Sequence, residues 1–246
     1  MLRVDGRTND DLRDFSLSRN VNRYAEGSCL VSTGHTKVYC TASVEDRQPH
    51  FLRDTQQGWV TAEYAMLPRA TQDRRRRDRG GQISGRTQEI QRIIGRSLRA
   101  ITDLDAIGPR TIQIDCDVLQ ADGGTRSASI CGAFVSLAQA CALLQSENKI
   151  RKWPLDGELA AVSVGIVNGE ILLDLCYEED SRAAVDMNVI MTSGEQIVEL
   201  QGSAEGRTFA RDEADDMIQI AWEGLQSIFR KQQKTLQGVG PYGEQR

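Results

Sequence analysis

The segment Ala-Asp-Gly-Gly-Thr-Arg-Ser at residues 121–127 lies between a predicted strand and the start of a predicted buried helix. Free backbone N–H groups and the helix dipole make such a junction an anion site, and glycines let an anion approach the backbone closely. Arg126 adds a planar guanidinium that fits phosphate oxygens, while Thr125 and Ser127 add hydroxyl donors. These features predict a phosphate site that includes Gly124, Thr125 and Arg126. An equally good interpretation of these residues alone is a glycine turn with Thr125 capping the helix.

Arg86 follows a glycine and lies at the start of a predicted helix over residues 86–102. It would add a second guanidinium to the phosphate site if the fold brings it near Arg126. A cation at a helix N-terminus gains nothing from the helix dipole, so the residues alone favour a solvated arginine.

An acidic run occupies residues 178–180, and Asp186 follows shortly after it. Such runs are usually solvated loops, but Asp186 precedes an apolar strand and is therefore expected near a buried edge. Two carboxylates that converge with a phosphate site are the usual arrangement for Mg²⁺, which takes few protein ligands and keeps its waters and substrate oxygens. The acidic residues therefore predict a magnesium site.

Basic residues concentrate in two places, although the whole chain has a net charge of −5. Residues 69–79 hold six arginines against two aspartates, a local balance of +4, and such a run can neutralise RNA phosphates. The helix predicted over residues 86–102 adds a basic stripe opposite its isoleucines. Both could also be solvated faces. The predicted RNA contacts are Arg69, Arg74, Arg75, Arg76, Arg77, Arg92, Arg96 and Arg99, with Arg79 in the same run.

Composition limits the alternatives. The chain has 246 residues, of which 39% are hydrophobic and 26% charged, as in ordinary globular proteins. Six scattered cysteines without a C-x-x-C pair, and only two histidines, argue against a zinc site. The N-terminus is charged from its third residue and lacks the apolar run of a secretory signal. Since no apolar stretch is expected to span a bilayer, we expect a cytoplasmic protein without a membrane partner.

The elements that must position these residues follow from hydrophobic periodicity. Strands are predicted over residues 28–33, 37–44, 59–66, 111–119, 160–168, 170–177, 185–192 and 196–202. Helices are predicted over residues 86–102 and 125–144 and from about residue 211. Two blocks of strands, each followed by a helix, indicate an α+β fold of mixed sheets packed with helices in duplicated halves. We expect a single domain over residues 1–236 and a flexible tail over residues 237–246.

Several separate motifs occur in the order found in the ribonuclease PH family, which this chain resembles from about Arg3 to Lys234. The motifs are RVDGR at 3–7, AEGS at 25–28, GHTKV at 34–38, LPRAT at 67–71, GRT at 85–87, IGRSLR at 94–99, GGTR at 123–126, EED at 178–180 and DMN at 186–188. The resemblance implies a core similar to domain 2 of ribosomal protein S5.

The resemblance also implies an activity. Members of this family are phosphate-dependent 3′-to-5′ exoribonucleases that trim tRNA precursors and other RNA 3′ ends, including rRNA, release nucleoside diphosphates, and can run backwards to add nucleotides. Arg86 and residues 124–126 match the family's phosphate-binding positions, with inorganic phosphate as co-substrate. Asp180 and Asp186 match its acidic, Mg²⁺-associated catalytic pair. The arginine run matches its RNA-guiding loop, and the family assembles as a homohexamer, a trimer of dimers.

The chemistry agrees with the residues at hand. Phosphate is already an anionic nucleophile at neutral pH, so neither a histidine-activated water nor a serine is needed. Two alternatives stay open. One is a non-catalytic, RNA-binding ring subunit of an exosome-like assembly, although such members typically lack the phosphate or acidic positions. The other is a hydrolytic nuclease, which would release monophosphates without added phosphate and for which a dense carboxylate cluster is missing.

Overall fold

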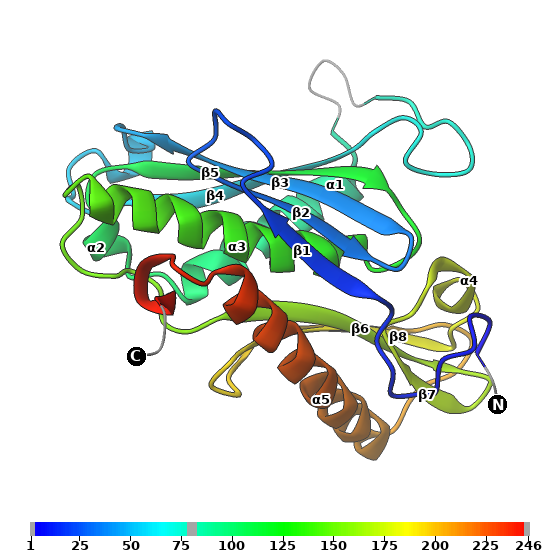
Figure 1. Ribbon diagram of the computed structural model, residues 1–246. Coiled ribbons are helices and arrows are strands. Elements are labelled where there is room, and N and C mark those ends of the chain that lie inside the picture. The colour runs from blue at the N-terminus through cyan, green and yellow to red at the C-terminus, as the bar shows by residue number, and fades with distance from the viewer. Residues whose placement is uncertain (1–2, 78–82, 244–246) are drawn as a thin grey trace.

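The computed structural model describes residues 3–77 and 83–243, and its strands form two sheets (Figure 1). The first sheet has the order β1-β2-β3-β5-β4, and the second has the order β7-β6-β8-β9. The strands are β1 (Phe15–Arg19), β2 (Gly27–Thr33), β3 (Thr36–Glu45), β4 (Trp59–Met66), β5 (Thr111–Gln120), β6 (Leu159–Val167), β7 (Glu170–Leu173), β8 (Val185–Thr192) and β9 (Ile197–Ala204).

Five α-helices join these strands in the described part of the chain. They are α1 (Gly85–Ala100), α2 (Leu104–Ile107), α3 (Thr125–Ser146), α4 (Tyr177–Asp180) and α5 (Arg211–Thr235), with short 3-10 turns at His50–Leu52 and Gly240–Tyr242. Helix α3 packs on β2 and β3 of the first sheet and on β6 of the second, between the two sheets (Figure 1). Helix α1 packs on β4, and α5 packs on β6.

The first sheet shows the alternation expected from the sequence. In β5 the apolar side chains of Ile112, Ile114, Cys116 and Val118 are all buried. Strand β4 runs parallel to β5, while the other pairs in this sheet are antiparallel. A parallel pair requires a crossover, which here contains α1 and α2. This crossover brings the start of α1 to the end of the sheet where β5 leads into α3.

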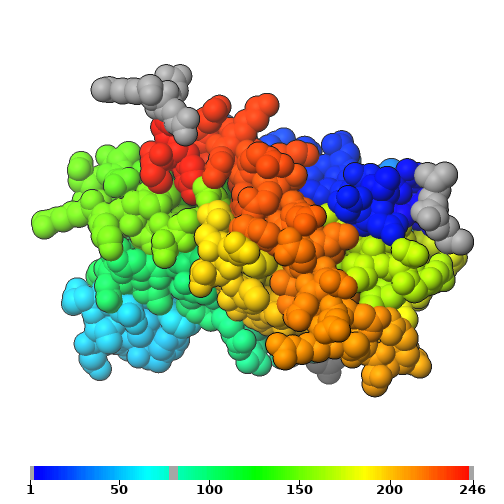
Figure 2. All heavy atoms as spheres, turned by 90° about the horizontal axis from the view of Figure 1, so that it is seen from below, coloured from blue at the N-terminus to red at the C-terminus, as the bar shows by residue number. Residues whose placement is uncertain are grey.

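The second sheet is antiparallel throughout. All nine residues of β6 are buried, because α3 and α5 both pack on this strand. Helix α5 buries one face, with Met217, Leu225 and Phe229 on it, and covers much of the surface in the view from below (Figure 2). The β6–β7 hairpin turns at Asn168-Gly169, as the sequence predicts.

One hydrophobic core cluster extends over both sheets and α3. The prediction of an α+β fold with mixed sheets and packed helices is therefore confirmed. The expectation that no apolar stretch could span a bilayer was wrong, because α3 is long and apolar enough by length and composition. In the structure, 89% of its most apolar window is buried inside the protein, so the apolar character of α3 serves the core.

The elements near the ends of the two sheets differ in part from those predicted. The sequence analysis missed β1, a five-residue strand paired with β2, and the short helix α2. The strand predicted over residues 170–177 ends at Leu173, because Asp174 adopts a left-handed conformation (φ 52°) and turns the chain into α4. Within the predicted tail, Gly240–Tyr242 form a 3-10 turn, and Tyr242 packs edge-on against Trp153 at a centroid distance of 6.3 Å.

Candidate active site

The glycine segment between β5 and α3 has the geometry of an anion-binding turn. Gly123 and Gly124 both adopt left-handed conformations, with φ of 72° and 65°. A Cβ atom on Gly123 would lie 2.6 Å from the Leu175 carbonyl oxygen and 2.8 Å from the Tyr177 nitrogen, so this position requires glycine. Gly124 is the N-cap residue of α3 and has no side chain to cap the first-turn N–H groups. These groups are therefore free of a side-chain cap, as anion binding requires.

The hydroxyl groups of this segment have partners outside it. Thr125 Oγ1 lies 2.9 Å from the Tyr64 hydroxyl oxygen, so the alternative in which Thr125 caps α3 was wrong. Ser127 Oγ donates to Asn188 Oδ1 at 3.4 Å. Burial raises the pKa of Tyr64, and its hydrogen bond with Thr125, in which either hydroxyl can be the donor, lowers that pKa in part.

Arg126 lies in the first turn of α3 and is largely buried. It donates from Nη1 to Gln201 Oε1 on β9, and its Nη2 lies 4.0 Å from Glu89 Oε1 on α1. Burial lowers its pKa, while the charge of Glu89 raises it and the charge of Arg86 lowers it. Arg86 itself is exposed in the first turn of α1. The structure thus brings Arg86 into electrostatic range of Arg126, as the phosphate-site prediction requires.

Asp180 and Asp186 approach the same place from the second half of the chain. Asp180 ends α4, and Asp186 lies on β8 and accepts a hydrogen bond from Ser203 Oγ at 2.9 Å. Although Asp180 is exposed, desolvation by the surrounding groups raises its pKa and the charge of Asp186 raises it further. Arg86 and Arg126 oppose that rise, so all four charged groups interact.

Buried arginines of the N-terminal segment fix the backbone that carries Asp180. Arg3 donates from Nε and Nη2 to the two carboxylate oxygens of Glu179 at 2.8 and 2.6 Å, and these side chains are only 2% and 3% exposed. Arg13 makes the same two-pronged contact with Asp174, at 3.0 and 2.7 Å. Burial alone would raise the pKa of Asp174, but the hydrogen bonds and charge of Arg13 lower it.

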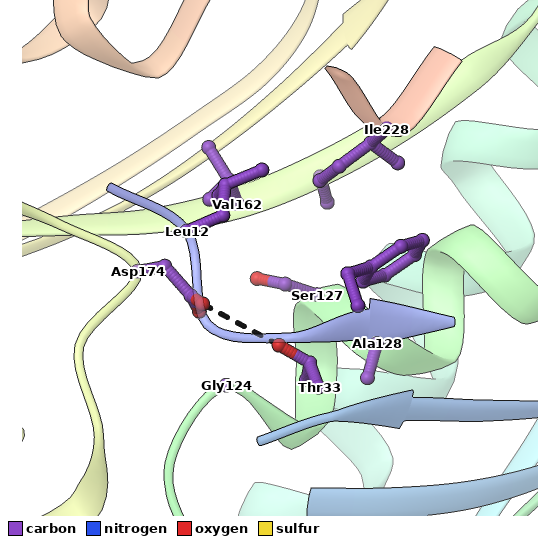
Figure 3. Close-up of a pocket in the computed structure, with 10 residues that line it drawn as sticks. Leu12, Thr33, Gly124, Ser127, Ala128, Val162, Asp174 and Ile228 are labelled. Carbon is purple, nitrogen blue, oxygen red and sulfur yellow. Dashed lines mark hydrogen bonds between the residues drawn. The ribbon is translucent and has the colours of Figure 1, made fainter. Parts of the chain in front are cut away.

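The same Asp174 network reaches the glycine segment. Arg13 Nη1 donates to the Asp122 carbonyl oxygen. Thr33 Oγ1 donates to Asp174 Oδ2 at 3.4 Å, and the two side chains point toward one another near Gly124 (Figure 3). The cavity drawn there measures about 10 Å³, the size of a single water site. It is therefore a gap behind the glycine segment and too small for a substrate.

The predicted RNA-binding arginines separate into groups. In the run at residues 69–77, Arg69 donates to the Gln72 carbonyl and Arg75 to the Met66 sulfur, while Arg74, Arg76 and Arg77 are exposed. Arg79 lies outside the described residues. The run therefore presents charge at the surface, as predicted.

The stripe predicted on α1 is only partly formed. Arg92 and Arg96 are exposed and line a groove of about 330 Å³ between α1 and β9. Arg99 turns away from it: its guanidinium stacks over the Trp59 ring at 4.2 Å and donates to the Val60 carbonyl at 2.8 Å. Arg99 therefore does not line the groove with the other two, although burial and the charge of Arg96 both lower its pKa.

The acidic pair fits the expected magnesium ion by its chemistry. Among the described residues no group of three or more histidine, cysteine, aspartate or glutamate side chains converges. A metal ion at this site would therefore have only the carboxylates of Asp180 and Asp186 as its protein ligands. Mg²⁺ takes one or two carboxylates and completes its shell with water and substrate oxygens. Desolvation is the main cause of the raised pKa of Asp180, and the charge of Asp186 adds to it; a cation between the two carboxylates would offset their mutual repulsion.

Sequence reasoning missed several residues of this site. Tyr64, Glu89 and Gln201 contact Thr125 or Arg126, but each lies in an ordinary strand or helix pattern without a local signal. Glu179 was grouped with a solvated acidic run, whereas it is buried against Arg3. For Glu179, the RVDGR motif was the one available signal, because an arginine-rich N-terminal segment needs an acidic partner when it is buried.

Comparison with known proteins places the fold. The rice (Oryza sativa) protein Rrp46 superposes with a TM-score of 0.75 at 19% identity, over 96% of this chain and 100% of that one. A chain of the Archaeoglobus fulgidus exosome with RNA bound to the active site gives a TM-score of 0.78 at 22% identity, over 93% and 92% of the two chains. A chain of an archaeal exosome core gives 0.75 at 21% identity, over 94% and 90%. These similarities establish a shared fold.

The family comparison goes further. The family model described as 3′ exoribonuclease family, domain 1, matches residues 11–142, and the one described as domain 2 of the same family matches residues 157–224. The first match contains Arg86 and Arg126, and the second contains Asp180 and Asp186. Because the two matches together cover most of the chain, this protein belongs to the 3′ exoribonuclease family of ribonuclease PH type.

Proposed function

We propose that this protein is a phosphate-dependent 3′-to-5′ exoribonuclease that removes the terminal nucleotide of RNA as a nucleoside diphosphate. The observation that carries the proposal is the convergence of two arginines and two aspartates from four elements, α1, α3, α4 and β8, at the uncapped N-terminus of α3. A hydrolytic nuclease whose site is built from carboxylates would not need two guanidiniums beside an anion-binding turn.

The arginines supply what phosphorolysis requires. The attacking phosphate and the scissile phosphodiester are both negative, so their approach is opposed by repulsion. Arg86 and Arg126, together with the N–H groups at the start of α3, offset that charge and hold the phosphate in line with the bond that breaks. A phosphate oxygen then bonds to the terminal phosphorus, and the 3′ oxygen of the preceding nucleotide leaves.

The leaving 3′ oxygen must take up a proton. Asp180 is the proposed proton donor, because desolvation and the neighbouring Asp186 raise its pKa toward the range that suits a general acid. Asp186 is fixed beside it by the hydrogen bond that it accepts from Ser203 Oγ. The two carboxylates would also hold Mg²⁺, which supplies charge neutralisation at the phosphoryl oxygens when bound.

The proposal also covers the substrate, the assembly and the cellular location. tRNA precursors and other 3′-extended RNAs are the proposed substrates, a homohexamer the proposed assembly, and the cytoplasm the proposed location. Exposed arginines at residues 74–77 support RNA binding through the phosphate backbone. Sedimentation of the purified protein at several concentrations would test the assembly.

A second candidate is an RNA-binding ring subunit without activity. It is favoured by the similarity to chains of exosome assemblies, one of them with RNA bound to its active site. The presence of Arg86, Arg126, Asp180 and Asp186 together supports the active enzyme over this candidate.

One experiment separates the candidates. Purified protein is incubated with a 3′-extended tRNA and Mg²⁺, with and without inorganic phosphate, and the released nucleotides are separated. Diphosphates that appear only with phosphate are the expected result. Monophosphates in both samples would identify a hydrolase, and RNA binding without any released nucleotide would identify the ring subunit.

A further inference from the structure

Arg126 is held by two residues that belong to none of the motifs in the sequence. Gln201 lies on β9, and Glu89 lies in the second turn of α1. Arg126 Nη1 donates to Gln201 Oε1, and Gln201 Nε2 donates to Glu89 Oε1. The three side chains therefore form a chain of hydrogen bonds that joins α3 to β9 and β9 to α1.

Glu89 determines which way the Gln201 amide faces. A carboxylate can only accept hydrogen bonds, so it selects the orientation in which Gln201 turns its NH₂ group to Glu89 and its oxygen to Arg126. The flipped amide would set two acceptors against each other at Glu89 and two donors against each other at Arg126. Glu89 thus makes Gln201 an acceptor for the guanidinium.

This arrangement leaves one edge of Arg126 for a ligand. Its Nη1 is occupied by Gln201, whereas its Nε is buried and has no hydrogen-bond partner within residues 3–77 and 83–243. A buried donor without a partner is costly. The Nε and Nη2 donors of a guanidinium form the fork that binds two phosphate oxygens at once, so an oxyanion at this edge would remove the cost.

We propose that Gln201 and Glu89 are positioning residues that orient the Arg126 guanidinium so that its Nε edge binds the attacking inorganic phosphate. The proposal rests on the proposed function and adds that phosphate affinity, but not RNA affinity, depends on these two side chains. Neither residue is proposed to touch phosphate: Gln201 acts through Arg126, and Glu89 acts through Gln201 and through its own ion pair with Arg126 Nη2 at 4.0 Å.

The test compares four variants with the wild type. Gln201→Ala removes the acceptor, and Glu89→Ala removes the partner of the Gln201 NH₂ group, so that Arg126 alone orients the amide. Glu89→Gln keeps a carbonyl oxygen that can accept from Gln201 and so should rescue. Leu200→Ala is the matched control, because Leu200 is the preceding residue of β9 and is 40% exposed, on the opposite face of the strand.

The expected result is a rise in the KM for inorganic phosphate of about tenfold in Gln201→Ala, which corresponds to about 1.4 kcal/mol. Glu89→Ala should show a smaller rise, while Glu89→Gln and Leu200→Ala should stay near the wild type. The Kd for a single-stranded RNA, measured without phosphate, should be unchanged in all variants. Calorimetric titration with inorganic phosphate alone should reproduce the same order without turnover.

Three outcomes overturn the proposal: an unchanged phosphate KM in Gln201→Ala, an equal rise in Leu200→Ala, or equal effects of Glu89→Ala and Glu89→Gln. The last result would mean that Glu89 acts only through its charge. If Gln201→Ala does not fold, the two Glu89 variants decide, since the Glu89 side chain is 44% exposed. A wild type that neither binds phosphate nor releases diphosphates would instead overturn the proposed function.

Discussion

The two basic regions of this protein are built in opposite ways. The arginines at the start of α3 and in the N-terminal segment are buried and tied to named partners: Arg126 to Gln201, Arg3 to Glu179, and Arg13 to Asp174. The arginines at residues 74–77 lie at the surface. The difference teaches that the place where bonds would change needs fixed geometry, whereas a flexible polyanion needs only a high density of positive charge.

The largest expected effect in this comparison is at Arg126. We expect Arg126→Ala to reduce phosphorolysis about 10²- to 10³-fold, because a preorganised charge at the reacting phosphate is lost, while RNA affinity stays close to wild type. Release of nucleoside diphosphates and RNA binding in a filter assay measure the two properties. Arg230→Ala, an exposed arginine on α5, serves as control. Comparable loss of both properties in a folded variant would contradict the separation of roles.

The next effect concerns the buried ion pairs. Asp174→Asn should lower the free energy of unfolding by about 3 kcal/mol, because it leaves the buried Arg13 guanidinium without its charged partner. Denaturant unfolding measures this change, with Asp156→Asn, an exposed aspartate, as control. A change below about 1 kcal/mol would show that the network around the glycine segment is not a stabilising one.

The exposed run predicts an effect on salt dependence. Replacing Arg74, Arg75, Arg76 and Arg77 by alanine should weaken RNA binding and reduce the slope of log Kd against log salt concentration by about 0.7 for each arginine that contacts phosphate. Unfolding free energy should hardly change. The joint replacement of Arg211 and Arg230 on α5 gives a comparison with exposed arginines elsewhere. An unchanged slope would place the run outside the RNA path.

The smallest expected effect distinguishes two aspartates near the site by their pH dependence. The pKa of Asp180 is raised above its ordinary 3.8 by desolvation and by Asp186, so its contribution to stability is present at low pH and is lost as the pH rises through the folded-state pKa. Asp180→Asn should therefore raise Tm slightly at pH 7, and this gain should fade toward pH 3.8. The melting curves need a chelator, so that no Mg²⁺ binds.

Asp174 should behave in the opposite sense. Its pKa is lowered by Arg13, so its contribution is present above the unfolded-state pKa and is lost as the pH falls through the lower folded-state value. Wild-type Tm should accordingly drop in acid, and the deficit of Asp174→Asn should shrink there. Parallel pH profiles for the two asparagine variants would show that Asp174 and Asp180 do not differ in environment.

Much of this protein was determined by local sequence. The alternation in β5, the apolar length of α3 and the glycines at 123–124 predicted the strand, the buried helix and the turn between them, because periodicity and backbone freedom are properties of neighbouring residues. The same holds for the family, whose motifs occur in order along the chain. The residues proposed for phosphate and metal binding were also named from the sequence.

Only the tertiary structure decided which groups meet and which do not. It placed Arg99 on Trp59 instead of with Arg92 and Arg96, and it buried Glu179 against Arg3 across 176 residues of chain. It also brought Gln201 and Glu89 to Arg126. The physical reason is that hydrogen bonds and ion pairs between distant segments leave no trace in local periodicity, since each partner lies in an ordinary strand, helix or acidic run until the sheets pack together.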